Sequence, residues 1–100
     1  MLSQLVGEPS VSSTSADIDR SNLRVIKHLG NWLNDLGFNT ELMPLPGRPD
    51  KANLIATLGP APREGKGGLV LAGHTDTVPF DESLWQSDPF TLKDTDDVFY

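Results

Sequence analysis

The feature that most constrains the fold of this chain is a short apolar run at residues 68–73, Gly-Leu-Val-Leu-Ala-Gly. The run shows no alternation of polar and apolar residues, so a strand formed from it must be covered on both faces. Such strands are typical of mostly parallel sheets with helices on each side. The run is also far shorter than the ~20 apolar residues that span a bilayer. We therefore expect an inner strand of a soluble α/β domain.

The pattern before the run agrees with an α/β arrangement. Apolar residues recur at steps of three and four over 23–36, which predicts an amphipathic helix. Gly37 is placed to end this helix, and Gly30 inside it costs ~1 kcal/mol relative to alanine. The remaining elements that we expect are a helix end over 1–6, N-cap candidates at Asp17, Asp19 and Ser21, a loop over 9–15, strands over 38–44 and 53–59, and a surface connection over 60–68.

The composition excludes several classes of protein. The chain has 100 residues, enough for one small domain, and no cysteine, so disulfides and thiolate metal sites are absent. A net charge of −6 argues against nucleic-acid binding, which needs clustered basic residues. Arg24 and Lys27 share the predicted helix, as does Arg20 if the helix begins at an earlier cap candidate, and all three are expected on its solvated face. The first residues lack the basic flank and long apolar stretch of a signal peptide, so we expect a cytoplasmic protein without membrane or nucleic-acid partners.

The residues directly after the apolar run carry the candidate chemistry. His74 and Asp76 follow the expected strand, where functional groups of open α/β sheets gather. In extended chain, residues two apart project to the same face. The Asp76 carboxylate can then accept a hydrogen bond from one imidazole nitrogen of His74 and leave the other for a metal ion. The triplet alone is also compatible with a histidine that is merely hydrogen-bonded at a strand end.

Three segments, in this order, resemble one enzyme family. Residues 69–81 (LVLAGHTDTVPFD) resemble the first metal-binding motif of the zinc-dependent aminoacylase and carboxypeptidase-like metallopeptidases. Residues 85–90 (WQSDPF) resemble the segment found just after that motif, and residues 9–12 (PSVS) resemble the proline-serine loop near the family's N-terminus. The resemblance extends over nearly the whole chain.

The resemblance implies a function and two site residues. It implies that His74 is a metal ligand and that Asp76 is the catalytic-site aspartate that orients it. It further implies two divalent ions, zinc or cobalt, and a largely parallel twisted sheet flanked by helices. Within the family, the endings Val-Pro-Phe-Asp and Ser-Asp-Pro-Phe favour an enzyme that removes the acetyl group from N2-acetyl-L-ornithine in arginine biosynthesis. The resemblance also implies that the partner is a small-molecule substrate and that the full-length protein is a homodimer. A desuccinylase or another N-acyl-amino-acid deacylase is the alternative within the family.

The same resemblance predicts that the site is incomplete. The bridging aspartate, the general-base glutamate and the other ligands of the family are expected beyond Tyr100, so residues 1–100 form the N-terminal portion of a catalytic domain and are inert alone. A non-catalytic protein that keeps the fold, or a plain α/β domain with an incidental His-Thr-Asp, are the alternatives from other classes. The acidic residues that we expect only as solvated turn and strand-edge charges are Asp81, Glu82, Asp88, Asp94, Asp96 and Asp97.

Overall fold

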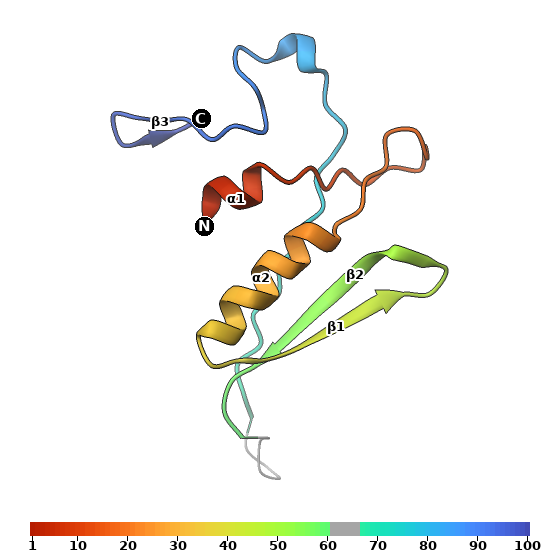
Figure 1. Ribbon diagram of the computed structural model, residues 1–100, viewed down its shortest axis with the longest axis vertical. Coiled ribbons are helices and arrows are strands. Elements are labelled where there is room, and N and C mark those ends of the chain that lie inside the picture. The colour runs from red at the N-terminus through yellow and green to blue at the C-terminus, as the bar shows by residue number, and fades with distance from the viewer. Residues whose placement is uncertain (61–66) are drawn as a thin grey trace.

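A computed structural model describes residues 1–60 and 67–100 of the chain (Figure 1). It mixes helices with small antiparallel sheets, so the expected combination of helix and strand is confirmed. The expected connection over 60–68 falls mainly on residues 61–66, outside the described part. The elements are α1 (Leu2–Val6), α2 (Leu23–Asp35), β1 (Asn39–Leu45), β2 (Arg48–Thr57), the short 3₁₀ helix η1 (Glu82–Leu84), β3 (Asp94–Thr95) and β4 (Val98–Phe99).

Helix α2 forms where the apolar period predicts it. The N-cap is Asn22 and not one of the three predicted candidates, and its side chain makes no capping hydrogen bond. The Ser21 hydroxyl, one residue earlier, accepts a hydrogen bond from the Leu23 backbone N–H at 3.2 Å and so satisfies one free donor of the first turn. Gly37 adopts a positive φ of 86°, and the Phe38 N–H reaches back to the Leu33 carbonyl. A left-handed glycine followed by such a backward bond ends many helices. The prediction for both ends of this helix is confirmed within a residue or two.

Strands β1 and β2 form an antiparallel hairpin that covers one side of α2 (Figure 1). The pairing runs from Asn39 opposite Thr57 to Leu45 opposite Arg48, and Gly47 turns the chain with a positive φ of 73°. Both strands were expected from the sequence, although β2 begins five residues earlier than predicted. Their antiparallel pairing differs from the mostly parallel sheet, because the short Pro-Gly turn returns the chain directly beside the first strand.

The small core lies between α2 and the hairpin. Val25 and Ile26 of α2 and Ala52 of β2 are buried, with Val11 buried further along the chain. Leu42 and Leu54 approach Gly30 from the two strands. Several other large apolar side chains remain exposed, so most of the stability of this part of the chain must come from the α2–hairpin contact.

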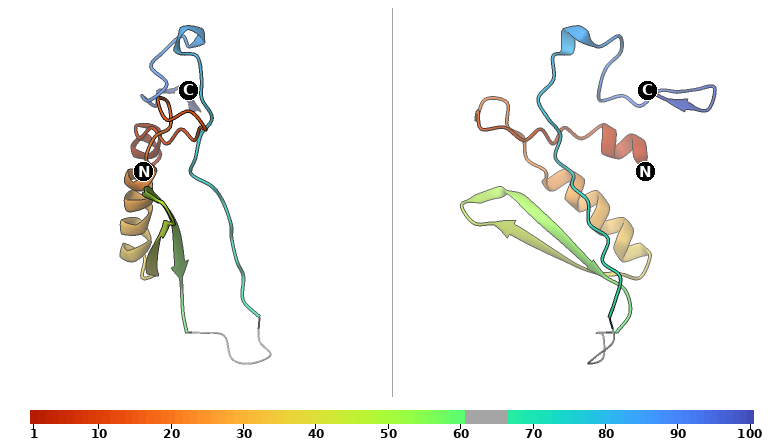
Figure 2. Two further views of the ribbon diagram at one scale, coloured as in Figure 1. Left: turned by 90° about the vertical axis from the view of Figure 1, so that its right-hand side faces the viewer. Right: turned by 180° about the vertical axis from the view of Figure 1, so that it is seen from behind.

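The apolar run after the connection is not a strand in this structure, which corrects the prediction. Residues 67–76 are extended but form no sheet, and they pass the side of the hairpin opposite to α2 (Figure 2). Leu69, Val70 and Leu71 are 84%, 87% and 86% exposed. A strand of this type needs neighbours on both edges and cover on both faces, and the described residues provide neither. In the described part of the chain, parallel pairing is limited to one bridge between Val11 and Thr77.

The last part of the chain is built from turns. Asp81 caps η1, and its side chain accepts hydrogen bonds from the Ser83 N–H and hydroxyl. Asp96 and Asp97 have positive φ angles in the turn between β3 and β4. These positions agree with the prediction that the acidic residues after the motif are turn and strand-edge charges. Within residues 1–60 and 67–100, no helix combines the length and apolar character needed to cross a membrane.

Candidate functional site

His74 and Asp76 lie in the extended segment, and their side chains meet as predicted. The His74 Nδ1 atom is 3.1 Å from the Asp76 Oδ1 atom, and it is also 3.1 Å from the Asp76 carbonyl oxygen. With the proton on Nδ1, the ring donates to this aspartate and keeps its Nε2 lone pair directed away from it. This is the arrangement by which a carboxylate prepares a neutral histidine to bind a metal ion. The assignment of His74 as a ligand stays a prediction.

Both side chains are exposed, at 83% for His74 and 56% for Asp76. Side-chain packing therefore does little to orient them, and their directions depend on the backbone. Within the described residues, no group of three or more histidine, cysteine, aspartate or glutamate side chains lies close enough to hold a metal ion. These two residues can supply one ligand and its hydrogen-bond partner, but a complete centre needs further donors.

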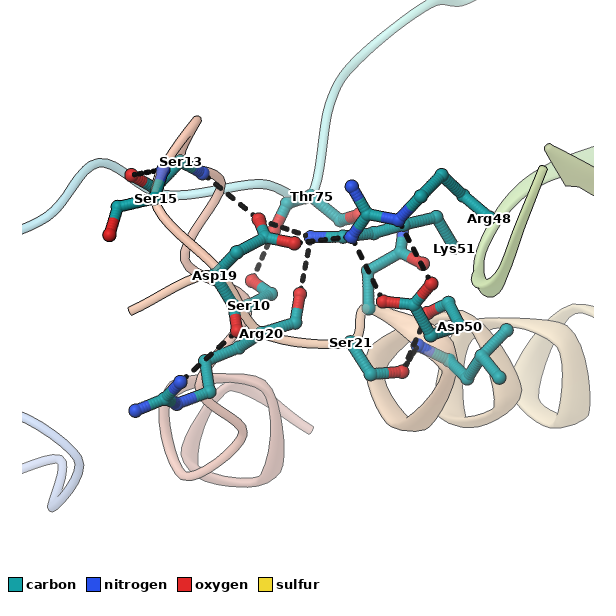
Figure 3. Close-up of polar contacts among 12 residues, drawn as sticks. Ser10, Ser13, Ser15, Asp19, Arg20, Ser21, Arg48, Asp50, Lys51 and Thr75 are labelled. Carbon is teal, nitrogen blue, oxygen red and sulfur yellow. Dashed lines mark hydrogen bonds and ion pairs between the residues drawn. The ribbon is translucent and has the colours of Figure 1, made fainter. Parts of the chain in front are cut away.

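The backbone of the motif is tied to the loop after α1. The Ser12 N–H donates to the Thr77 carbonyl at 2.8 Å, and the Thr77 N–H donates to the Ser10 carbonyl at 3.1 Å. The Ser10 hydroxyl donates to the Thr75 carbonyl at 2.5 Å (Figure 3). These three contacts join segments that lie 65 or more residues apart in the sequence. We call residues 10–12 together with 75–77 the serine clamp.

Only part of this clamp could be predicted from the sequence. The loop over 9–15 was predicted, and it is rich in hydroxyl side chains of the kind that hold turns. The Ser10 hydroxyl does bind a backbone carbonyl group, that of Thr75, and Ser10 is only 3% exposed. The choice of Thr75 as its partner has no local pattern that sequence analysis can detect.

A second polar cluster fixes the loop that leads from the clamp into α2. The Asp19 carboxylate accepts hydrogen bonds from the Ser13 N–H at 2.9 Å, from Lys51 Nζ at 3.0 Å and from Arg48 (Figure 3). Lys51 is buried to 8% exposure and also donates to the Arg20 carbonyl. Asp19 was expected as a helix cap, and the structure shows it instead joining the loop to β2. The Ser13 N–H, and then Arg48 and Lys51, hold the pKa of the Asp19 carboxyl well below its usual range.

No protein-family model matches the chain. It is 55% identical over all 100 residues to an acetylornithine deacetylase of Pasteurella multocida, and 52% identical over 97 residues to one of Photorhabdus laumondii. A third, from Salmonella arizonae, is 50% identical over 96 residues. By sequence, the chain is thus similar to part of each of these acetylornithine deacetylases.

The similarity covers 100%, 97% and 96% of this chain but only 25%, 24% and 24% of these three deacetylases. The chain therefore spans about a quarter of the length of the curated relatives it matches. The names of the relatives agree with the interpretation of the Val-Pro-Phe-Asp and Ser-Asp-Pro-Phe segments, which favoured a deacetylase over a desuccinylase.

Proposed function

We propose that this chain is part of an amide hydrolase that converts N2-acetyl-L-ornithine and water to L-ornithine and acetate, a step of arginine biosynthesis. The observation that carries the proposal is the 50–55% identity, along the whole chain, to proteins named acetylornithine deacetylase. The contact between His74 and Asp76 supports it independently, because it supplies an oriented imidazole of the kind that metal-dependent hydrolases use.

The donor set fits a divalent metal ion such as zinc or cobalt. His74 offers a neutral nitrogen, a ligand type that both ions accept, and Asp76 holds the proton on the other ring nitrogen. A bound metal ion would polarise the scissile carbonyl and lower the pKa of a water molecule toward neutrality. In a protein of the relatives' length, the residues outside this chain would have to supply the other ligands, the second ion's site and the general base.

The same proposal places the chain in a larger fold. Residues 1–100 would be the N-terminal portion of the catalytic domain, and residues 69–72 would become an inner strand of a mostly parallel sheet in it. Coverage of this run would remove the exposed apolar surface seen here. We further propose a cytoplasmic homodimer that takes a small N-acetyl amino acid as its substrate.

The decisive experiment replaces His74 in a protein of the relatives' full length. We expect His74→Ala to lower zinc content and to reduce kcat/KM for N2-acetyl-L-ornithine by more than ~100-fold, since loss of a ligand exceeds the 10- to 100-fold cost typical of its outer partners. Asp76→Asn should fall within that 10- to 100-fold range. Metal content by mass spectrometry and a ninhydrin assay of released ornithine give the two readouts.

His28→Ala is the matched control, because His28 lies on α2 and contacts Glu8 and Trp32 instead of the motif. Wild-type zinc content and hydrolysis in His74→Ala would overturn the assignment. A panel of N-acetyl, N-succinyl and N-formyl amino acids tests the substrate, and preference for a succinyl group would move the protein to the desuccinylases.

A further inference from the structure

The serine clamp acts on the peptide units that flank the candidate site residues. Thr75 lies between His74 and Asp76 in the sequence, and Thr77 follows Asp76 directly. The Ser10 hydroxyl holds the Thr75 carbonyl, while the backbone of residues 10 and 12 holds the N–H and carbonyl of Thr77. The backbone is thus fixed on both sides of Asp76.

Burial is distributed unevenly across this contact. Ser10 and Val11 are 3% and 6% exposed, whereas the side chains of His74 and Asp76 are 83% and 56% exposed. The loop at residues 10–12 is therefore held in place by the residues packed around it, whereas the motif depends on its contacts with this loop. Asp76 and His74 can keep their 3.1 Å contact only while the intervening Thr75 peptide stays in one orientation.

We propose that Ser10 is a positioning residue for the His74–Asp76 pair: its buried hydroxyl sets the orientation of the Thr75 peptide and thereby the direction of the imidazole. The inference rests on the proposed function, because it gives the pair its role toward a metal ion. The hydroxyl is separable from the rest of the clamp, since the two bonds to Thr77 use only backbone atoms. Removing the hydroxyl frees the Thr75 carbonyl and leaves the two backbone hydrogen bonds to Thr77 in place.

The test compares Ser10→Ala with Ser13→Ala in the full-length protein. Ser13 is in the same loop, and its hydroxyl accepts a hydrogen bond from the Ser15 N–H without touching residues 74–77. We expect Ser10→Ala to weaken zinc affinity ~10-fold, the lower end of the range for outer partners of a metal ligand. Its kcat should fall with little change in KM, and its Co²⁺ absorption spectrum should shift. Ser13→Ala should match the unsubstituted protein in all three.

Ser10→Thr keeps the hydroxyl and is compatible with extended backbone, so it should restore zinc affinity and the Co²⁺ spectrum. Zinc affinity is measured by competition with a chromophoric chelator, which needs no substrate. If Ser10→Ala does not fold, as judged by circular dichroism, Ser10→Cys replaces it, because it keeps the volume but donates more weakly.

The outcomes separate this inference from the proposed function. Equal zinc affinity, spectrum and kcat in the Ser10 and Ser13 variants, with only the melting temperature lowered by the Ser10 change, would overturn the positioning role. If the unsubstituted protein binds zinc but leaves N2-acetyl-L-ornithine intact, the proposed substrate fails, and Ser10 is then judged by the zinc affinity and spectrum alone.

Discussion

Asp19 illustrates how a single carboxylate organises the chain before α2. It receives hydrogen bonds from the Ser13 backbone, Arg48 and Lys51, and the ammonium group of Lys51 is itself buried. An ionised Asp19 is therefore required in the folded state, since a buried cation without its partner is strongly unfavourable. The half-buried Asp50 assists by binding Arg48, and this ion pair lowers the pKa of Asp50 as well.

This arrangement predicts a sensitivity to acid. Because folding lowers the pKa of Asp19, its stabilising contribution is fully present above the unfolded-state pKa of ~3.9 and declines as the pH falls below that value. Asp19→Asn should lower the urea midpoint at pH 7 and flatten the loss of stability between pH 7 and pH 3. Asp17→Asn, an exposed change in the same loop, serves as the control and should leave the pH profile intact. A pH profile of Asp19→Asn that parallels the unsubstituted chain would contradict this.

Contacts between near neighbours in the sequence were easier to predict than contacts between distant residues. The contact between His74 and Asp76 was predicted, because residues two apart in extended chain share a face. Asp19 was one of three predicted candidates for the helix cap, since aspartate before a helix often takes that position. The actual partner Lys51 lies 32 residues away, and such tertiary contacts leave no trace in local pattern.

Helix α2 is the element that organises the described fold, and Gly30 is its weakest residue. A Cβ atom at Gly30 would lie 3.7 Å from Leu54 Cδ1 and 3.9 Å from Leu42 Cδ1, which are ordinary contact distances. The glycine is therefore not needed for close approach of the hairpin.

We expect Gly30→Ala to stabilise the protein by ~1 kcal/mol, the difference in helix propensity between the two residues. Gly37→Ala should do the opposite, because a side chain at a φ of 86° costs about 1–2 kcal/mol. Urea denaturation followed by circular dichroism measures both. A destabilised Gly30→Ala variant would mean that Leu42 and Leu54 pack more tightly against the helix than these distances imply.

For the helix and the hairpin strands, the sequence predicted where each element forms but not how the strands pair. The period of α2 and the glycine at its end are local signals, and both were interpreted correctly. The partner of a strand is decided by turns and by the rest of the sheet, so the hairpin of β1 and β2 was missed. The apolar run at residues 69–72 was assigned from its composition to an inner strand, and composition says only that it needs cover.

The molecule as a whole leaves that run uncovered. Leu69, Val70 and Leu71 together form an exposed apolar segment whose backbone is unpaired in the described part of the chain. Exposed edges of this composition tend to pair with other chains.

The 100-residue chain alone is therefore expected to self-associate as its concentration rises. Val70→Lys should shift the sedimentation profile toward the monomer, because a charge within an exposed strand opposes edge-to-edge pairing. Leu36→Lys is the matched control, since Leu36 is also exposed, at 68%, but lies just after α2. A chain that remains monomeric at every concentration, or that responds equally to both changes, would contradict this prediction.

The serine clamp has one further consequence, for how the site comes into being. The Ser10 hydroxyl and the Thr75 carbonyl are 65 residues apart, and closing so long a loop has an entropic cost that the intervening helix and hairpin reduce by shortening the path between its ends. A synthetic peptide that carried the His-Thr-Asp triplet would hold both reactive groups and lack the partner that aims them. The geometry of the His74–Asp76 pair in this chain is thus an outcome of folding rather than a property of the triplet.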